Sequence, residues 1–270
     1  MRVIKISGHN LNDEAYVDRF AQAVAAIAKS EPVIVINGGG ASIGELQAAF
    51  DIKERKIQGL RVTDEQSLKI TEMVMSGSAN KQVVRGLRRA GLNAMGLSGI
   101  DGGIMTAQKK ILPPRVPNPD QRIPFPFNKP MPEDDLGFVG DVVSVDADAM
   151  RKFMDLGYTL VLSPVSCDAD GQHYNINADD AATAVAQGLN ADQLDFVSVV
   201  PGVKFNLTDE TIIPILTPSE AVNLIRKGSI QGGMIPKVNA ALEGLEMGIE
   251  QVRIVDLESM SDGGTIFKNT

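Results

Sequence analysis

The sequence of 270 residues has little of the material from which several common sites are built: one cysteine, two histidines and no tryptophan. The single cysteine, Cys167, excludes an internal disulfide framework and is typical of a reducing compartment. Two histidines, His9 and His173, are too few for a histidine-rich zinc site. No serine, histidine and acid arrangement of a hydrolase is evident. We therefore expect neither a metal hydrolase nor a serine hydrolase.

Basic charge and long apolar runs are also scarce. The chain has 26 basic and 34 acidic side chains and a formal net charge of −8, whereas a nucleic-acid or anionic-membrane binder needs a basic surface. No apolar run reaches the roughly 20 residues that span a bilayer, and no charged-then-apolar leader opens the chain. We expect a cytoplasmic protein that binds neither nucleic acid nor membrane.

Short apolar runs alternate with longer helical patterns. The runs are nearly continuous, which is typical of strands covered on both faces; they are Val3–Ile6, Val33–Ile36, Ala94–Leu97, Leu160–Ser163, Phe196–Val200 and Val252–Val255. The helical patterns are Glu14–Lys29, Ile43–Phe50, Asp64–Met75, Lys81–Ala90, Ala147–Leu156, Asp180–Leu189, Ser219–Arg226 and Val238–Met247. This order predicts an α/β protein with a mainly parallel central sheet.

A proline-rich segment between Leu112 and Pro132 interrupts this pattern. Proline lacks the N–H group that a strand ladder needs, so we expect a loop there. Met105–Lys109 before it and Phe138–Val145 after it look like the arms of a β-hairpin that the loop extends. The loop is either a surface insertion or a lid or partner contact.

Glycines follow four of the predicted strands, although the common nucleotide motifs are missing. The chain has no Gly-Lys dipeptide for a phosphate loop, and Ile43 stands where a dinucleotide motif begun by Gly38 needs its third glycine. The glycine turns are at Gly8, Gly38–Gly40, Gly99–Gly102 and Gly202. Ligands bind at the carboxyl ends of parallel strands, where glycine lets backbone N–H groups approach an anion. With cations nearby, these turns favour an anionic ligand over a purely structural role.

Three cations occupy settings that suggest an anionic partner. Lys5 lies in a buried-looking strand, where an unpaired ammonium group is costly. Lys237 follows Pro236 at a predicted helix start, where the helix dipole disfavours a cation. Arg61 precedes a helix and could fork onto a carboxylate. Taken singly, each is better explained as a solvated surface cation.

The segment Tyr174–Asp180 leads into an alanine-rich helix. One interpretation is that Asn177 or Asp179 is the N-cap of that helix. Alternatively, Asn175 bonds a ligand and Asp179 orients lysine ammonium groups. The residues alone leave both interpretations open.

Taken together, these segments resemble the amino-acid kinase family, and most closely its acetylglutamate branch. The resemblance covers almost the whole chain, through Lys5–Gly8, Gly38–Gly40, Gly59–Asp64, Asn80–Lys81, Gly96–Gly102, Leu136–Val142, Tyr174–Asp179 and Gly232–Lys237. The Asn-x-Asn-Ala-Asp and Gly-Gly-Met-x-x-Lys pieces together are specific, and the string Gly59–Asp64 points to the branch.

The resemblance implies a three-layer α/β/α sandwich with two lobes. Residues 1–170 would bind the amino-acid substrate and form a homodimer, and residues 171–270 would bind ATP. The implied activity is phosphorylation of the side-chain carboxylate of N-acetyl-L-glutamate by ATP and Mg²⁺, giving an acyl phosphate of arginine biosynthesis.

The resemblance also implies a role for individual residues. Lys5 and Lys237 would neutralise charge on the transferring phosphoryl group, and Asp179 would hold both lysines. The acid would be bound by Gly39, Gly40, Arg61 and Asn175, and the nucleotide by Ser7, Gly8, Ser198, Gly202 and Lys237. No residue is expected to bind a metal. A carboxylate nucleophile, with an ordinary pKa near ~4.3, is already ionised and needs no general base.

The chain departs from the family pattern at several places. Ser7 replaces a glycine, His9 replaces a small polar residue, and Val199 stands where an aspartate is expected near the nucleotide. The sequence begins at its first strand, without the helix of the arginine-inhibited hexameric members, so a homodimer without that regulation is implied.

Two other functions are compatible with the sequence. One is a kinase for an N-modified 2-aminoadipate of lysine biosynthesis, because one extra methylene is worth only ~1–3 kcal/mol in a pocket. The other is a catalytically silent sensor of amino acid or nucleotide with the same fold, which Ser7 and Val199 motivate.

Overall fold

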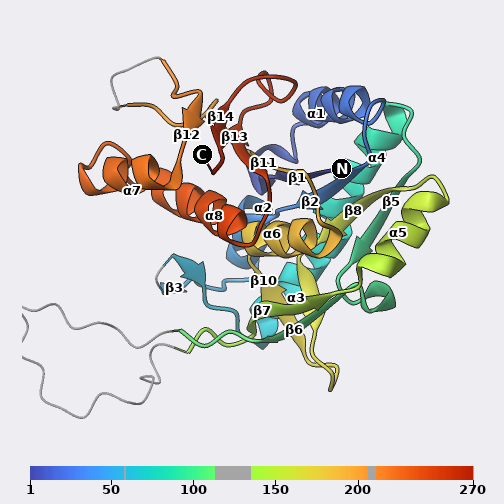
Figure 1. Ribbon diagram of the computed structural model, residues 1–270. Coiled ribbons are helices and arrows are strands. Elements are labelled where there is room, and N and C mark those ends of the chain that lie inside the picture. Colours follow the sequence, from blue (N-terminus) through green and yellow to red (C-terminus); the bar gives the residue numbers. More distant parts are fainter. Residues whose placement is uncertain (58, 113–134, 206–210, 270) are drawn as a thin grey trace, which may run out of the picture.

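An eight-stranded sheet runs through the computed structural model, which describes residues 1–57, 59–112, 135–205 and 211–269 (Figure 1). The strand order is β12-β14-β13-β11-β1-β2-β8-β5. The strands are β1 Arg2–Ile6, β2 Val33–Asn37, β5 Ala94–Ser98, β8 Thr159–Ser163, β11 Gln193–Val197, β12 Ile215–Leu216, β13 Gln251–Val255 and β14 Thr265–Phe267. All neighbours are parallel except β13 and β14. The prediction of a mainly parallel sheet is confirmed.

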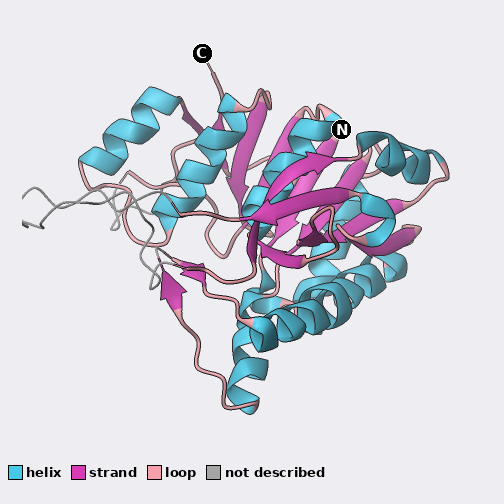
Figure 2. Cartoon of the chain, turned by 90° about the horizontal axis from the view of Figure 1, so that it is seen from below, coloured by secondary structure: helices cyan, strands magenta, loops and turns pink. Residues whose placement is uncertain are grey.

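Helices cover both faces of this sheet, which gives three layers (Figures 1 and 2). They are α1 Glu14–Ile27, α2 Gly40–Ala49, α3 Glu65–Glu72, α4 Asn80–Arg89, α5 Ala147–Asp155, α6 Ala178–Leu189, α7 Pro218–Arg226 and α8 Met234–Glu246. Along β1, Val3 packs into the core beneath α6 and α8, whereas Ile4 packs into the core beneath α1 and α4. Burial on both faces explains the continuous apolar runs. None of the described helices combines the length and apolarity needed to cross a membrane.

Strand β1 lies where the direction of winding changes. Helix α1 leads from β1 to β2 on one side, whereas α6 leads into β11 on the other side, so β1 pairs with both strands. In parallel α/β sheets such a switch point opens a crevice at the carboxyl ends of the strands. Here those ends are Ile6, Asn37 and Val197.

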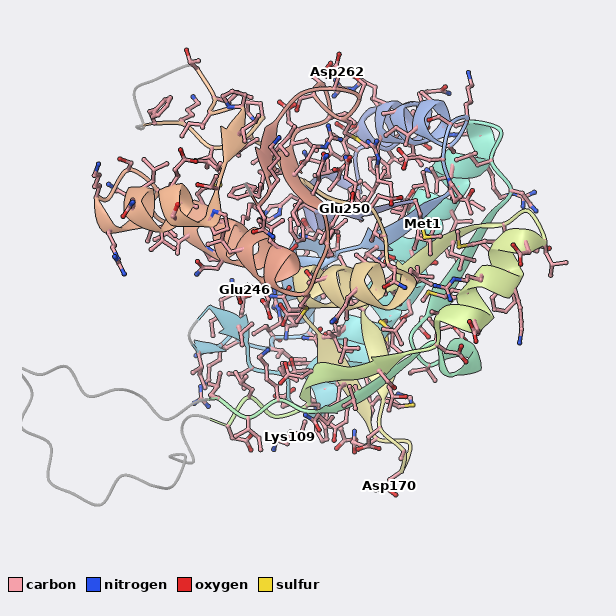
Figure 3. The ribbon with its side chains drawn as sticks, in the orientation of Figure 1. Met1, Lys109, Asp170, Glu246, Glu250 and Asp262 are labelled. Atoms are coloured by element: carbon pink, nitrogen blue, oxygen red, sulfur yellow. The ribbon has the colours of Figure 1, made fainter. Side chains whose placement is uncertain are left out.

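A smaller sheet lies beside the main one. Its strands β6 Met105–Lys109, β7 Val139–Val145, β9 Val165–Cys167 and β10 His173–Ile176 close into a barrel in the order β10-β7-β6-β9. The predicted hairpin is confirmed as β6 and β7, but β9 and β10 were not predicted. Asp170, labelled in Figure 3, marks the turn between β9 and β10. The proline-rich segment 112–132 lies, apart from Leu112, outside the described residues.

The predicted strand Phe196–Val200 is wrong by three residues, because β11 is Gln193–Val197. Asp195 looks like a loop residue in the sequence, yet it is fully buried in the middle of β11. It lies opposite Arg253 of β13, whose Nε and Nη2 donate to its carboxylate over 2.8 and 2.6 Å. The pair neutralises charges that would otherwise exclude both residues from the sheet.

Three helix predictions also needed correction. The predicted helices Asp64–Met75 and Lys81–Ala90 belong to one helical run, since a π-helical turn, Met73–Ala79, joins α3 to α4. Its small residues are poor helix formers and resemble a break in the sequence. Helix α8 begins at Met234, four residues before the predicted start, so Pro236 lies in its first turn, where proline is tolerated.

Candidate active site

Two glycine-containing loops meet at the carboxyl ends of β1 and β2. A short 3₁₀ turn, Gly8–Asn10, follows β1, and Gly38 to Gly40 lead from β2 into α2. A Cβ atom on Gly8 would lie 2.5 Å from the backbone nitrogen of Gly39, which is closer than side chains come. Glycine at position 8 therefore allows the two backbones to touch, and this contact forms one end of the site.

Lys5 and Asp179 form an ion pair next to these loops. Lys5 lies in β1 and is only 8% exposed, and its Nζ atom is 2.9 Å from Oδ1 of Asp179. Asp179 is placed by the start of α6, where the Asn177 side chain caps the helix and accepts from the Asp179 N–H over 2.7 Å. Of the two capping residues considered, the cap is Asn177, which leaves the Asp179 carboxylate for the lysine.

Lys237 approaches this pair from the first turn of α8. Burial lowers the pKa of its ammonium group, and the positive charge of Lys5 lowers it further, whereas Asp179 opposes the shift. Lys237 is thus within electrostatic reach of both. Among the described residues the ion pair of Asp179 is with Lys5 and not with Lys237. A third group of negative charge would relieve the repulsion between the two lysines.

Arg61 is held firmly at the edge of the site by strand β4, Leu60–Arg61, which pairs with β3, Lys56–Ile57. Its Nη2 atom lies 2.8 Å from the Glu54 carboxylate and donates to the Gly40 carbonyl over 3.1 Å, and its Nη1 atom donates to Gln47. Burial lowers the pKa of the guanidinium, and Glu54 opposes that effect. The group is oriented before any ligand arrives.

Asn175 occupies β10, in the smaller sheet. Its side-chain amide donates to the hydroxyl of the buried Thr63 over 3.1 Å, and its backbone N–H donates to Phe138 over 2.9 Å. Thr63 immediately precedes Asp64, the N-cap of α3. The Asn175 amide is therefore held between the smaller sheet and the start of this helix.

Most of these residues surround one pocket of about 360 Å³, but Lys237 is not among the residues that line it. The predicted site residues that line it are Lys5, Ser7, Gly8, Gly39, Gly40, Arg61, Asn175 and Asp179. Lys56 also lines it, so the wall carries three cations and one carboxylate in a protein of net charge −8. Such local positive charge attracts an anionic ligand.

Ser198 and Gly202 do not line this pocket. Both follow β11, and the backbone N–H of Ser198 donates to Val255 over 2.7 Å. A Cβ atom on Gly202 would lie 2.5 Å from Oγ1 of Thr265, so the glycine allows close packing against β14. The residue between them that departs from the family pattern, Val199, is 68% exposed.

The other departures lie at the pocket itself. The Ser7 hydroxyl is 3.2 Å from Nδ1 of His9, so the two substituted residues contact each other. Both line the pocket beside Gly8. Where the family pattern has a glycine, this chain therefore has the Ser7 side chain in contact with His9.

Several residues of the site were not predicted from the sequence, among them Glu54, Lys56 and Met75. Lys56 and Glu54 belong to the run Lys53–Lys56, which resembles a solvated charged face and gives no sign that it folds against Arg61. Met75 lines the pocket from the π-helical turn, which the sequence does not reveal. Met75 is placed by a contact with Asn37, far away in the sequence, whereas Glu54 and Lys56 are placed by the short pairing of β3 with β4.

The arrangement suits one kind of chemistry. Buried ammonium groups, an oriented guanidinium and backbone N–H groups at the crevice of a parallel sheet can bring two anionic reactants together, as a phosphotransferase requires. A model of the amino acid kinase family matches residues 1–256. The chain belongs to this family, and the resemblance noted in its motifs is confirmed.

The relatives are similar over nearly their full length. The acetylglutamate kinase of Chloroflexus aurantiacus (strain ATCC 29366 / DSM 635 / J-10-fl) is 40% identical over 98% of this chain and 95% of its own. That of Methanopyrus kandleri is 37% identical over 99% of this chain and 100% of its own. Among solved structures, the carbamate kinase of Giardia lamblia bound to AMP-PNP aligns with a TM-score of 0.70 over 100% of this chain and 98% of that one, at 17% identity. This last likeness concerns the fold.

Proposed function

We propose that the protein is an acetylglutamate kinase, which transfers the γ-phosphoryl group of ATP to the side-chain carboxylate of N-acetyl-L-glutamate. The product is an acyl phosphate of arginine biosynthesis. The observation that carries the proposal is the buried Lys5–Asp179 pair on the wall of a positively charged pocket. Relatives with this activity in their names, at 37–40% identity over nearly the whole chain, support the choice of substrate.

The acid substrate would be bound by groups that the pocket already orients. Arg61 would bind its α-carboxylate, and the backbone N–H groups of Gly39 and Gly40 would bind the reacting end. Asn175 would bond the acetylated backbone of the substrate. Arg61 and Asn175 already have protein partners, so a small exchange of hydrogen bonds suffices for binding.

Charge neutralisation would supply most of the catalysis. The attacking carboxylate is ionised at neutral pH, so no base is required. Lys5 and Lys237 would stabilise the negative charge of the transferring phosphoryl group. Asp179 would act as a positioning residue, because its carboxylate is ion-paired with the Lys5 ammonium group and so is not free to act as a base.

The nucleotide would lie on residues 171–270, with its phosphates between Ser7, Gly8 and Lys237 and the rest of the molecule near Ser198 and Gly202. The described residues hold no group of three or more His, Cys, Asp or Glu side chains that could enclose a metal ion. The oxygen donors of Mg²⁺ would therefore come mainly from the triphosphate, as is common for this ion. Mg²⁺ so bound would reduce the charge of the phosphates.

The protein would act as a homodimer formed by residues 1–170. Several large apolar side chains in that part are exposed, namely Phe50, Met73, Ile111, Val143 and Leu156. Val199, Phe205, Ile215 and Met247 are exposed in the rest of the chain, so the assignment of the dimer contact to residues 1–170 follows the family resemblance. Light scattering on the purified protein is expected to give twice the mass of 28.8 kDa, and a monomer at micromolar concentration would contradict the assembly.

The activity is tested by trapping the acyl phosphate with hydroxylamine. The purified protein is incubated with ATP, Mg²⁺ and a panel of acids: N-acetylglutamate, N-acetyl-2-aminoadipate and N-acetylaspartate. We expect the largest kcat/KM with N-acetylglutamate. A preference for the longer acid would instead identify a lysine-biosynthesis kinase, and ATP binding without any hydroxamate would identify a sensor.

A further inference from the structure

A chain of hydrogen bonds lies behind the glycine loop of the pocket. Nζ of Lys81 donates to Oδ1 of Asn80 over 2.8 Å, and Nδ2 of Asn80 donates to Oδ1 of Asn37 over 2.9 Å. Nδ2 of Asn37 then donates to the carbonyls of Met75, over 3.0 Å, and Gly38, over 3.3 Å. Both asparagines are fully buried, and neither lines the pocket.

The series of hydrogen bonds runs in one direction, with donors on the Lys81 side and acceptors on the pocket side. A lysine ammonium group only donates, so the atom of Asn80 that faces it must be the oxygen. The Asn80 nitrogen then donates to Asn37 and to the Val161 carbonyl of β8, over 2.9 Å. The Asn37 oxygen is thereby occupied, and its nitrogen must face Met75 and Gly38. The carbonyls of Val161, Met75 and Gly38 require the same orientations of the two amides, so the whole series of hydrogen bonds runs in one direction from the Lys81 charge to the pocket walls.

The two carbonyls at the inner end belong to two walls of the pocket. Gly38 begins the glycine loop, and Met75 comes from the π-helical turn. The walls also touch directly, because a Cβ atom on Gly39 would lie 3.1 Å from Cγ of Met75. Asn37 thus joins the loop to the helical run at the point where both meet the ligand.

We propose that Lys81, Asn80 and Asn37 are positioning residues that hold the Gly38–Gly40 loop and Met75 in the geometry that binds the acid substrate. The inference rests on the proposed function, because it assigns the loop to the acid. It gives a role to the Asn80–Lys81 motif, which makes no contact with the pocket. The loss of any member is expected to weaken acid binding more than nucleotide binding.

A double-mutant cycle between Lys81 and Asn37, which do not touch each other, tests the relay. Asn37→Asp keeps the acceptor for Asn80 but loses both donors, and we expect KM for the acid to rise about tenfold, the loss of a net hydrogen bond. Lys81→Met in the wild-type background is expected to raise it roughly threefold. In the Asn37→Asp background the same change is expected to have no further effect, because the inner end is already disconnected. The dissociation constant of the nucleotide is expected to stay within about twofold throughout.

The control is Arg85→Met, which removes another exposed cation from α4, one that pairs with Glu14 instead. Its kinetics should match the wild type. Additive effects of Lys81→Met and Asn37→Asp, or a lower melting temperature with unchanged KM, would overturn the inference. If Asn37→Asp does not fold, unchanged KM in Lys81→Met overturns it equally. Absence of turnover in the wild type with every acid would instead overturn the proposed function.

Discussion

At the scale of single residues, Lys237 shows that the site is suited to bind a negatively charged group. Its side chain is half-buried near Lys5, and its pKa is lowered both by this burial and by the charge of Lys5. Such a cation is destabilised until an anion arrives, and the gain is largest when the most negative charge develops. Lys237 should therefore contribute more to turnover than to ground-state binding.

We expect Lys237→Ala to lower kcat about 10²- to 10³-fold, the size seen when one preorganised donor to a transition state is removed. KM for the acid should change only a few-fold. Steady-state kinetics by the hydroxamate assay measures both. Equal losses in kcat and in substrate affinity would contradict a role specific to the transition state.

The same lysine predicts a pH effect on nucleotide binding. The pKa of Lys237 is lowered in the free protein, and the negative triphosphate is expected to raise it again. At a pH between these two pKa values, binding of the nucleotide must therefore be accompanied by uptake of a proton. Calorimetry in buffers of different ionisation enthalpy, at a series of pH values below the ordinary lysine pKa of ~10.4, should detect this uptake. Lys237→Met should abolish it, and an unchanged uptake in the variant would assign the proton to another group.

At the scale of secondary-structure elements, strands β11 and β13 share a buried charge pair. Asp195 and Arg253 lie opposite each other, and Arg2 of β1 adds a third charge 3.3 Å from the same carboxylate. The carbonyls of Gly263 and Met260 accept from the Arg253 guanidinium. Removing the carboxylate would leave Arg253 without its counter-ion inside the sheet, whereas Arg2 would keep its ion pair with Glu31.

We expect Asp195→Ala to lower the free energy of unfolding by about 3–5 kcal/mol, the cost of breaking a buried pair. The exposed pair of Arg19 and Glu258 gives a matched comparison, and Arg19→Ala should cost less than about 1 kcal/mol. Urea unfolding of both variants measures the difference. Similar losses would mean that burial does not decide the strength of these pairs.

The elements also show what a sequence can predict. Apolar runs predicted each central strand, since both faces are buried, and most helices were predicted within a few residues. The errors occur where a distant partner changes the local preference: Asp195 is accommodated in a strand because Arg253 and Arg2 neutralise its charge. The same holds in the site. Eight of the predicted site residues line the pocket, whereas Lys56 and Met75 also line it although no local pattern predicted them there.

At the scale of the whole molecule, the two halves of the chain are joined through β1. This strand pairs with β2 on one side and with β11 on the other. Lys5 of the first half is paired with Asp179 of the second. Two lobes defined at residue 170 would therefore share one sheet and one site.

A fragment of residues 1–170 is therefore expected not to fold by itself. Its β1 would lose β11, and Lys5 and Arg2 would lose the carboxylates of Asp179 and Asp195. Circular dichroism during urea titration should show no cooperative transition for the fragment, under conditions where the full chain shows one. A cooperative transition would mean that the first lobe is an independent domain.

The central place of β1 also has a consequence for synthesis in the cell. Arg2–Ile6 leave the ribosome about 190 residues before Gln193–Val197, the strand that completes their pairing. At roughly 5–20 residues per second, one edge of an apolar strand stays open for on the order of 10–40 seconds. Open apolar edges invite pairing with other nascent chains. The yield of this protein in a host should therefore depend on translation speed and on chaperones that shield the growing chain.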